Sequence, residues 1–210
     1  MDLIRLRNSL PKHVNLLAVS KGQPASKIRS LFSKGQIDFG ESRLQEALPK
    51  LNELNDLYGI QWHFIGNLQT NKVRQVVKAF EVIHSIDSIK LARRVSRIAG
   101  EEGKKPRLMA QVKLREDPNK SGFNYENLLN EWDEFIKLPD IDVIGLMTIC
   151  PISLDLNERK SLFRECRFLA DKLQLKDCSM GMSGDWEQAV EAGATWIRLG
   201  TLLFRSSIQT

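Results

Sequence analysis

Residues 15–24 read "NLLAVSKGQP", a stretch in which an apolar run meets a lysine and then a break in regular structure. The apolar run, Leu16–Val19, is short enough to be a buried strand, and Gly22 and Pro24 end it. A strand buried on both faces gives an ammonium group no favourable neighbour, because burying an unpaired charge is costly. Lys21 therefore either extends into solvent or takes part in chemistry at the strand end.

Short apolar runs of this kind recur along the chain and alternate with helical patterns. Between them, apolar residues follow the i, i+3, i+4 spacing of an amphipathic helix, as at Leu91, Ala92 and Val95. Strands that alternate with helices predict right-handed βαβ units and a parallel sheet. The eight predicted strands are Leu16–Val19, Ile37–Phe39, Trp62–Ile65, Val82–Ile86, Leu108–Val112, Val143–Ile149, Cys178–Met182 and Trp196–Leu199.

Eight strands distributed over the whole chain favour a closed (β/α)8 TIM barrel. With 210 residues the chain is near the lower end for this fold, so we expect one domain over residues 1–210 with short loops. An open, doubly wound parallel sheet is the alternative, and periodicity alone does not exclude it. The residues that follow the strands favour the barrel.

Composition indicates a soluble globular protein, since 42% of the residues are hydrophobic and 27% are charged. The N-terminal residues contain no uninterrupted apolar region typical of a signal peptide, and no window is long and apolar enough to cross a membrane. Cys150, Cys166 and Cys178 are odd in number and scattered, which predicts reduced thiols and a cytoplasmic location.

The net charge of +5 raises the possibility of nucleic-acid binding. The basic residues are spread out, however, and the densest group, between Arg93 and Lys105, is diluted by Glu101 and Glu102. No basic run is interleaved with aromatic residues, as a single-strand binder requires. We therefore expect a mildly basic, solvated surface and no nucleic-acid partner.

Polar residues follow almost every predicted strand, which is unusual for the ends of buried strands. The active site of a barrel lies where its strands end, at the C-terminal face. A ring of polar residues that includes a lysine therefore predicts a pocket. The residues at these positions are Ser20, Lys21, Gly40, Glu41, Ser42, His63, Asn67, Ser85, Asp87, Lys113, Met147, Thr148, Ser183, Gly184, Arg198, Gly200 and Thr201.

Two small turns point to an anion in this pocket. In "SMGMSGDWEQA" the chain leaves a strand through Ser183 and Gly184 and enters a helix, so backbone N–H groups face the pocket. Gly200 and Thr201 form a second turn after the last strand. Barrel phosphate sites typically form after strands seven and eight, where these turns fall. A simple helix cap explains the first turn alone, but its pairing with the second turn favours a phosphate site.

A phosphate site and a lysine in one barrel suggest a phosphorylated aldehyde held as a Schiff base, because a desolvated amine near cations becomes nucleophilic. Pyridoxal 5′-phosphate (PLP) is the obvious candidate. Its pyridine nitrogen needs a protein partner, and Arg198 points inward just before the second turn. Arginine stays protonated, so it donates a hydrogen bond to that nitrogen without protonating it. Such a ring is a weak electron sink, which suits racemisation or simple cofactor holding.

Seven motifs also resemble a known family in order and spacing: "AVSK", "DFGESRLQE", "WHFIGNLQTNK", "HSID", "GLMTI", "MGMSGDWEQA" and "GATWIRLGT". They are similar to those of the PLP-binding homeostasis protein family (YggS-like or PROSC-like proteins), and the resemblance runs from about Leu16 to Phe204. It implies a single-domain, usually monomeric barrel of the alanine racemase N-terminal type, with PLP bound to Lys21.

The resemblance also implies roles for individual residues. Phosphate contacts come from Ser183, Gly184, Gly200 and Thr201; Arg198 faces the pyridine nitrogen, and Met147 lines the face of the ring. One position departs from the family pattern, since Ser42 stands where the family usually has asparagine close to the cofactor. Serine is shorter, so a direct contact there becomes water-mediated and holds the cofactor less firmly.

Other polar residues permit more than one interpretation. His63 either acts as an acid or base or is hydrogen-bonded for structure, and His84 with Asp87 either forms a relay or satisfies neighbouring loops. Lys120 is either a secondary anion contact or a solvated loop residue. No spacing of His, Cys or carboxylate residues matches a metal site.

Three functions remain open from the sequence. The first is a PLP carrier or regulator in vitamin B6 homeostasis that passes the cofactor to apo-enzymes. The second is a small PLP-dependent racemase, which by resemblance needs a second domain and a tyrosine base from a partner subunit. The chain ends at Thr210 soon after the last strand, and Tyr58 and Tyr125 are not at strand ends, so we favour the non-catalytic carrier. The third is a phosphate-binding barrel enzyme without PLP.

Overall fold

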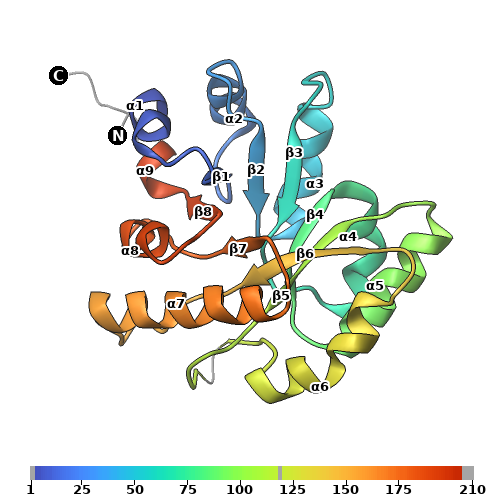
Figure 1. Cartoon of the computed structure of the whole chain (residues 1–210). Helices are drawn as coiled ribbons and strands as arrows, with labels where there is room; N and C mark the ends of the chain where they lie inside the picture. Colours follow the sequence, from blue (N-terminus) through green and yellow to red (C-terminus); the bar gives the residue numbers. More distant parts are fainter. Residues whose placement is uncertain (1–2, 118–119, 205–210) are drawn as a thin grey trace.

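The computed structural model, which describes residues 3–117 and 120–204, is a closed barrel of parallel strands in which each strand pairs with the next and β1 pairs with β8. Figure 1 shows the strands at the centre and the helices around them. The strands are β1 (Asn15–Val19), β2 (Asp38–Glu41), β3 (Gln61–Phe64), β4 (Val82–Ile86), β5 (Arg107–Gln111), β6 (Asp142–Met147), β7 (Asp177–Ser179) and β8 (Trp196–Leu199).

All eight strands lie within one or a few residues of the predicted runs, so the (β/α)8 barrel is confirmed and the open sheet is wrong. The first and last strands pair with each other and close the barrel, with Leu17 of β1 in register with Arg198 of β8. The helices are α1 (Leu3–Ser9), α2 (Ala25–Phe32), α3 (Leu44–Glu53), η1 (Thr70–Lys72, a 3₁₀ turn), α4 (Val73–Ala79), α5 (Ile89–Glu101), α6 (Tyr125–Ile136), α7 (Leu156–Lys172), α8 (Trp186–Glu191) and α9 (Thr201–Phe204).

Two of these helices, α1 and α9, are not predicted from the sequence. α9 follows β8 directly, at the position where the sequence indicates only a small turn. Several longer helices begin at polar caps: the side chains of Ser88 and Asn124 accept backbone N–H groups at the starts of α5 and α6. Asp155 and Glu158 form a reciprocal capping box at the start of α7. The caps satisfy N–H groups that a helix end otherwise leaves unpaired.

The apolar core has two parts. Most of it lies between the outer faces of the strands and the surrounding helices, in the layer expected of a barrel. A smaller cluster fills the inside of the barrel and consists of Leu17, Met109, Met147 and Trp196. Polar side chains share this interior with the smaller cluster, which makes the inside of the barrel the chemically distinctive part of the fold.

Two glycines allow backbone segments to approach closely. A Cβ atom at Gly66 would lie 1.9 Å from the carbonyl oxygen of Ser42, and one at Gly145 would lie 2.4 Å from that of Asp177. Both distances are too short for a side chain, so the loop after β3 rests against the end of β2, and β6 against β7, only because glycine is present. Gly66 thereby fixes the position of Ser42.

A buried ion pair holds the ends of β1 and β2 together outside the barrel. Lys50 of α3 forms an ion pair with Glu41, whose side chain is fully buried, and donates to the carbonyl oxygen of Ser20 at 2.9 Å. The Ser20 hydroxyl donates to Glu41 Oε1 at 2.7 Å. Lys21 and Ser42 directly follow two of these residues, so the network positions both.

We expect Lys50→Met to lower the free energy of unfolding by about 3–5 kcal/mol, because it leaves the buried carboxylate of Glu41 without a cation. Urea unfolding followed by circular dichroism measures the change. The matched control is Lys78→Met, which removes an exposed partner of Glu102 and is expected to change little. Equal effects of the two variants would contradict a structural role for the buried pair.

Candidate functional site

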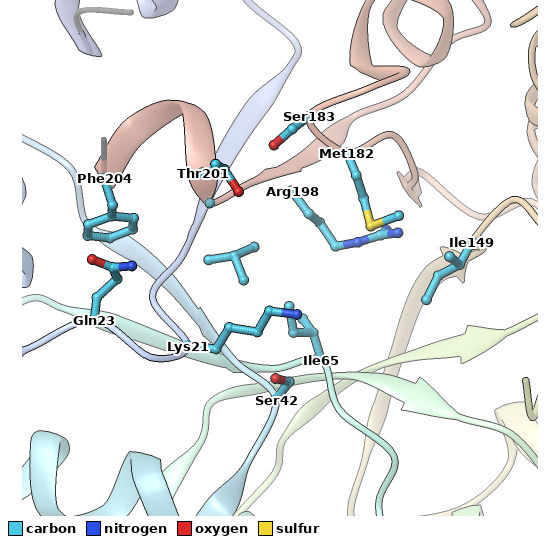
Figure 2. Close-up of a pocket in the computed structure, with 12 residues that line it drawn as sticks. Lys21, Gln23, Ser42, Ile65, Ile149, Met182, Ser183, Arg198, Thr201 and Phe204 are labelled. Carbon is cyan, nitrogen blue, oxygen red and sulfur yellow. The ribbon is translucent and has the colours of Figure 1, made fainter. Parts of the chain in front are cut away.

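A cavity of about 390 Å³ opens at the C-terminal end of the barrel. Figure 2 shows side chains from several strand ends converging on it. Ligand pockets of soluble proteins are typically about 300–1,000 Å³, so the cavity has the size of a small-molecule site. Its lining residues are Val19, Lys21, Gln23, Ser42, Ile65, Ile149, Met182, Ser183, Arg198, Gly200, Thr201 and Phe204.

Lys21 is exposed and lines the cavity two residues after the end of β1. Figure 2 shows its side chain extending into the space between Ser42 and Arg198. In the described chain its ammonium group has no hydrogen bond or ion pair. The lysine at the end of the first strand is thus neither buried nor used in packing, and its amine is accessible to a ligand.

Arg198 contributes a cation from inside the barrel. Its side chain is buried, and burial lowers its pKa to about 10, so the guanidinium stays protonated at neutral pH. Nη1 donates to the carbonyl oxygen of Ser179 at 2.6 Å, and Nη2 donates to that of Thr148 at 2.9 Å. The Nε–H group has no acceptor among residues 3–117 and 120–204, so a ligand in the cavity can accept from it.

Backbone N–H groups form a second feature of the cavity. Those of Ser183, Gly184 and Gly200 have no acceptor within the described ranges, and the first N–H groups of α9 are unpaired as in any first helical turn. Gly200 also packs tightly, since a Cβ atom there would lie 3.0 Å from the carbonyl oxygen of Val19. Such converging donors favour an anion, above all a phosphate.

Asp185 and Arg159 fix the loop that carries Ser183. The buried carboxylate of Asp185 accepts the N–H group of Met182 at 2.7 Å and Nη1 of Arg159 at 3.1 Å. The side chain of Asp185 therefore holds the backbone of its own loop in place. Arg159 neutralises the negative charge of this carboxylate, which would otherwise repel an anion nearby. This ion pair thereby holds the anion cradle, by which we mean the backbone N–H groups of Ser183, Gly184 and Gly200.

Apolar side chains form the rest of the wall. Ile65 and Ile149 pack against the small cluster inside the barrel and line the cavity above it. Phe204 of α9 lies on another side, where Lys27 donates to its carbonyl oxygen at 3.2 Å and to Gln23 Oε1 at 3.2 Å. The cavity thus combines a polar cradle with an apolar surface suited to an aromatic ring.

The structure brings most of the predicted site residues together. Six of the eight line the cavity: Lys21, Ser42, Ser183, Arg198, Gly200 and Thr201. Gly184 is next to the lining and exposed, whereas Met147 is fully buried inside the barrel and does not line the cavity. The side chain that lines the cavity at this position is that of Ile149, two residues after the end of β6.

Sequence reasoning missed the apolar part of the site. Ile65, Ile149 and Met182 end three of the predicted strands, so their position at the strand ends indicates that they line the cavity. The sequence pattern does not indicate that Gln23 and Phe204 line the cavity. Gln23 lies in a loop, and Phe204 lies in helix α9, which the sequence does not predict.

Two of the three histidines, His63 and His84, lie inside the barrel and not in the cavity. His63 Nδ1 and His84 Nε2 are 2.9 Å apart, and both side chains are fully buried. His84 Nδ1 is 2.9 Å from the hydroxyl of Ser179, so both of its ring nitrogens have partners and neither partner is Asp87. The relay suggested for His84 and Asp87 is therefore not formed, and His63 does not line the cavity.

The remaining candidates lie elsewhere. Lys120 donates to the carbonyl oxygen of Cys150 and pairs with Asp117, which makes it a loop residue. Neither Tyr58 nor Tyr125 lines the cavity. The part of the chain described here holds no cluster of His, Cys, Asp or Glu able to bind a metal. Among its helices, none is long and apolar enough to span a membrane.

The fold and the cavity define a class: a parallel (β/α)8 barrel with an accessible lysine, a buried arginine and an anion cradle where its strands end. Residues 3–207 match the family model described as "Alanine racemase, N-terminal domain". A relative from Synechocystis, "Pyridoxal phosphate homeostasis protein", is 45% identical over 93% of this chain and 93% of its own length.

Two solved structures of PipY from Synechococcus elongatus are also similar. The structure without PLP superposes with a TM-score of 0.95 at 48% identity, and the structure with PLP bound with a TM-score of 0.92 at 46% identity. In both cases the match covers 96% of this chain and 97% of PipY. The chain belongs to the pyridoxal phosphate homeostasis proteins of the alanine racemase N-terminal domain family.

We expect the free energy of unfolding to fall as the pH drops below about 6.5, the ordinary pKa of histidine. Burial lowers the pKa of both His63 and His84, so the unfolded chain takes up protons that the folded chain does not. Each histidine contributes a slope of up to about 1.4 kcal/mol per pH unit between its ordinary pKa and its lowered one.

Urea unfolding measured from pH 7.5 to pH 5 tests this dependence. His84→Asn is expected to reduce the slope, and the matched control, His13→Asn at an exposed position, is expected to leave it unchanged. A stability that stays constant over this range would show that the buried pair takes up protons in the folded state.

Proposed function

We propose that this protein binds PLP in the cavity and serves vitamin B6 homeostasis by holding the cofactor and delivering it to apo-enzymes. One cavity brings together an accessible amine at Lys21, a buried cation at Arg198 and N–H groups of Ser183 and Gly200 that have no acceptor in the described part of the chain, and this observation carries the proposal. These match the aldehyde, ring nitrogen and phosphate of PLP. PipY, which is 46% identical, has a structure described as "with PLP bound".

Each group of the chain has a defined task in this arrangement. The N–H groups of the two turns hold the phosphate, and the Nε–H group of Arg198 donates to the pyridine nitrogen. With PLP bound, Lys21 would be the residue that holds the cofactor covalently, through its amine and the aldehyde carbon. Met182 and Ile149 contact the ring. The flanking Gly184 adds a donor to the phosphate, and Met147 supports the floor of the cavity from below.

Ser42 is the position at which this chain differs from the family pattern. It lines the cavity, and the backbone at Gly66 holds it in place. Because serine carries a hydroxyl where asparagine carries the longer carboxamide, its contact with the cofactor is through water, and binding is weaker than an asparagine would give.

The same site supports holding PLP rather than racemising an amino acid. Two-base proton transfer needs a positioned group on each face of the substrate carbon, and neither tyrosine of this chain lines the cavity. An exposed lysine also leaves the covalent bond accessible for exchange. We propose a monomeric cytoplasmic carrier, in keeping with three free cysteines in the described chain.

The alternative is a racemase-like activity, which the shared barrel favours. Incubation of the PLP-loaded protein with L-alanine in D₂O separates the two. A carrier leaves both the α-proton and the chirality of alanine unchanged. Appearance of D-alanine, or of deuterium at Cα, would establish catalysis and overturn the non-catalytic proposal.

We expect the protein incubated with PLP to gain a Schiff-base absorbance band that borohydride removes, and we expect Lys21→Ala to lack it. The reason is that the amine of Lys21 is the cavity's nucleophile. The control is Lys34→Ala at an exposed position outside the cavity, which is expected to keep the band. Mass spectrometry of the reduced protein then places the adduct on Lys21. Protein that stays colourless with PLP would refute the proposed function.

We expect Ser42→Asn to tighten PLP binding. A direct hydrogen bond contributes about 0.5–1.5 kcal/mol, which corresponds to a two- to tenfold lower Kd. Fluorescence titration of the protein with PLP gives the Kd. Ser42→Ala serves as the matched control and weakens binding or leaves it unchanged. An equal Kd for the serine and asparagine forms would show that this position does not contact the cofactor.

A further inference from the structure

A continuous row of hydrogen bonds runs through the inside of the barrel and ends at the buried arginine of the cavity. Arg198 Nη1 donates to Ser179 Oγ at 2.9 Å, and Ser179 Oγ is 2.9 Å from His84 Nδ1. His84 Nε2 is 2.9 Å from His63 Nδ1, and His63 Nε2 is 3.1 Å from Asp38 Oδ1. We call these residues, from Asp38 to Arg198, the interior chain.

The interior chain connects the two ends of the barrel. Asp38 is the first residue of β2 and lies where the strands begin, with 18% of its side chain exposed. Arg198 lines the cavity where the strands end. The three residues between them, Ser179, His84 and His63, are fully buried. They form a polar path of side chains across an otherwise apolar interior.

Hydrogen-bond logic gives the interior chain one direction. The guanidinium of Arg198 has only donors, so Ser179 Oγ accepts from it and uses its own proton toward His84 Nδ1. His84 must then carry its proton on Nε2 and donate to His63 Nδ1. His63 in turn carries its proton on Nε2 and donates to the carboxylate of Asp38. Every proton points from the cation toward the anion, and both histidines are the neutral Nε2–H tautomer.

The interior chain also stabilises the positive charge of Arg198. Its direct acceptors in the described chain are all neutral: the carbonyl oxygens of Ser179 and Thr148 and the hydroxyl of Ser179. Asp185 acts on it only through space, since the oxygens of this carboxylate bind Met182 and Arg159. A buried cation without a bonded carboxylate is costly unless polarised neighbours stabilise it. The interior chain provides such neighbours and ends at a carboxylate.

We propose that Asp38, His63, His84 and Ser179 act as one positioning device that orients Arg198 toward the ligand in the cavity and stabilises its charge from the opposite end of the barrel. Ser179 fixes the guanidinium at Nη1, which leaves Nε–H directed at the cavity. The identity of the ligand as PLP rests on the proposed function, whereas the arrangement of the interior chain does not depend on it. None of the four residues touches the ligand, so each is a positioning residue.

The first test uses the ligand-free protein and reads the histidine tautomers by ¹⁵N NMR. The proposal expects both His63 and His84 as neutral Nε2–H tautomers at pH 7.5, and it expects Ser179→Ala to change the signal of His84. A protonated histidine, or an Nδ1–H tautomer at either position, would break the single direction of hydrogen bonds and overturn the proposal.

The second test compares Ser179→Ala with Ser179→Thr. Removing the hydroxyl frees Nη1 of Arg198 on one side, so we expect Ser179→Ala to weaken PLP binding by about tenfold, as for the loss of a hydrogen bond to a charged group. Ser179→Thr keeps the hydroxyl and is expected to keep the Kd. Urea unfolding of both variants separates affinity from stability. If Ser179→Ala binds PLP as tightly as the wild-type protein, the carbonyl contacts of Arg198 suffice and the proposal fails.

The third test acts at the far end, on Asp38. Asp38→Asn keeps an acceptor for His63 but removes the charge, and we expect a several-fold higher Kd for PLP at an unchanged fold. The control is Asp133→Asn, an exposed carboxylate on α6 whose loss is expected to have no effect. If Asp38→Asn has the Kd of the wild-type protein, the remote counter-charge is excluded.

The outcomes separate this inference from the proposed function. If the wild-type protein does not bind PLP, the proposed function fails, and the interior chain is then judged by the histidine tautomers and by the Nε–H signal of Arg198 in the ligand-free Ser179→Ala variant. A shifted or broadened Arg198 signal supports positioning by Ser179. An unchanged signal overturns it.

Discussion

The buried guanidinium of Arg198 is the constraint on which the barrel and its site both depend. A cation inside a barrel has to be surrounded by hydrogen-bond acceptors. Here the acceptors are the carbonyl oxygens of Ser179 and Thr148 and the hydroxyl of Ser179, which belongs to the interior chain. The apolar cluster of Leu17, Met109, Met147 and Trp196 fills the remaining volume. One part of the interior thus provides apolar packing, and the other part stabilises the charge of Arg198. Because Arg198 lines the cavity, this second part determines which ligand groups the cavity can bind.

Closure of the sheet converts this interior into a site. Parallel strands carry the residues that follow them to a single edge, so side chains far apart in the sequence, such as Lys21 and Arg198, line one cavity. The buried pair of Glu41 and Lys50 acts outside the barrel, and the pair of Asp185 and Arg159 acts under the cradle loop. Each ion pair holds a segment whose neighbouring residues face the cavity, so stability and site geometry share the same contacts.

The sequence predicted the fold well because the alternation of strands and helices is a local signal, and every predicted strand is present. Polar residues at strand ends located the site for the same reason, and six of the eight predicted site residues line the cavity. Met147 shows the limit of this reasoning. Met147, the last residue of β6, is fully buried inside the barrel, whereas Ile149 beyond the strand end lines the cavity. The sequence pattern does not show how deep in the barrel each residue of a strand lies. The partners of His63 and His84 were also out of reach, because they join four different strands.

The two reactive groups of the site differ in exposure, and the difference bears on what the site does. Arg198 is buried and hydrogen-bonded on one side, which fixes its position, whereas Lys21 is exposed and has no hydrogen bond or ion pair within residues 3–117 and 120–204. Under the proposed function, the contact of Arg198 with the ring nitrogen is therefore preorganised at the closed side of the cavity. Under the same proposal, the covalent bond to Lys21 forms and breaks at the open side, where a competing amine can approach. Firm recognition combined with an accessible bond is what a protein needs to hold a reactive aldehyde and still release it.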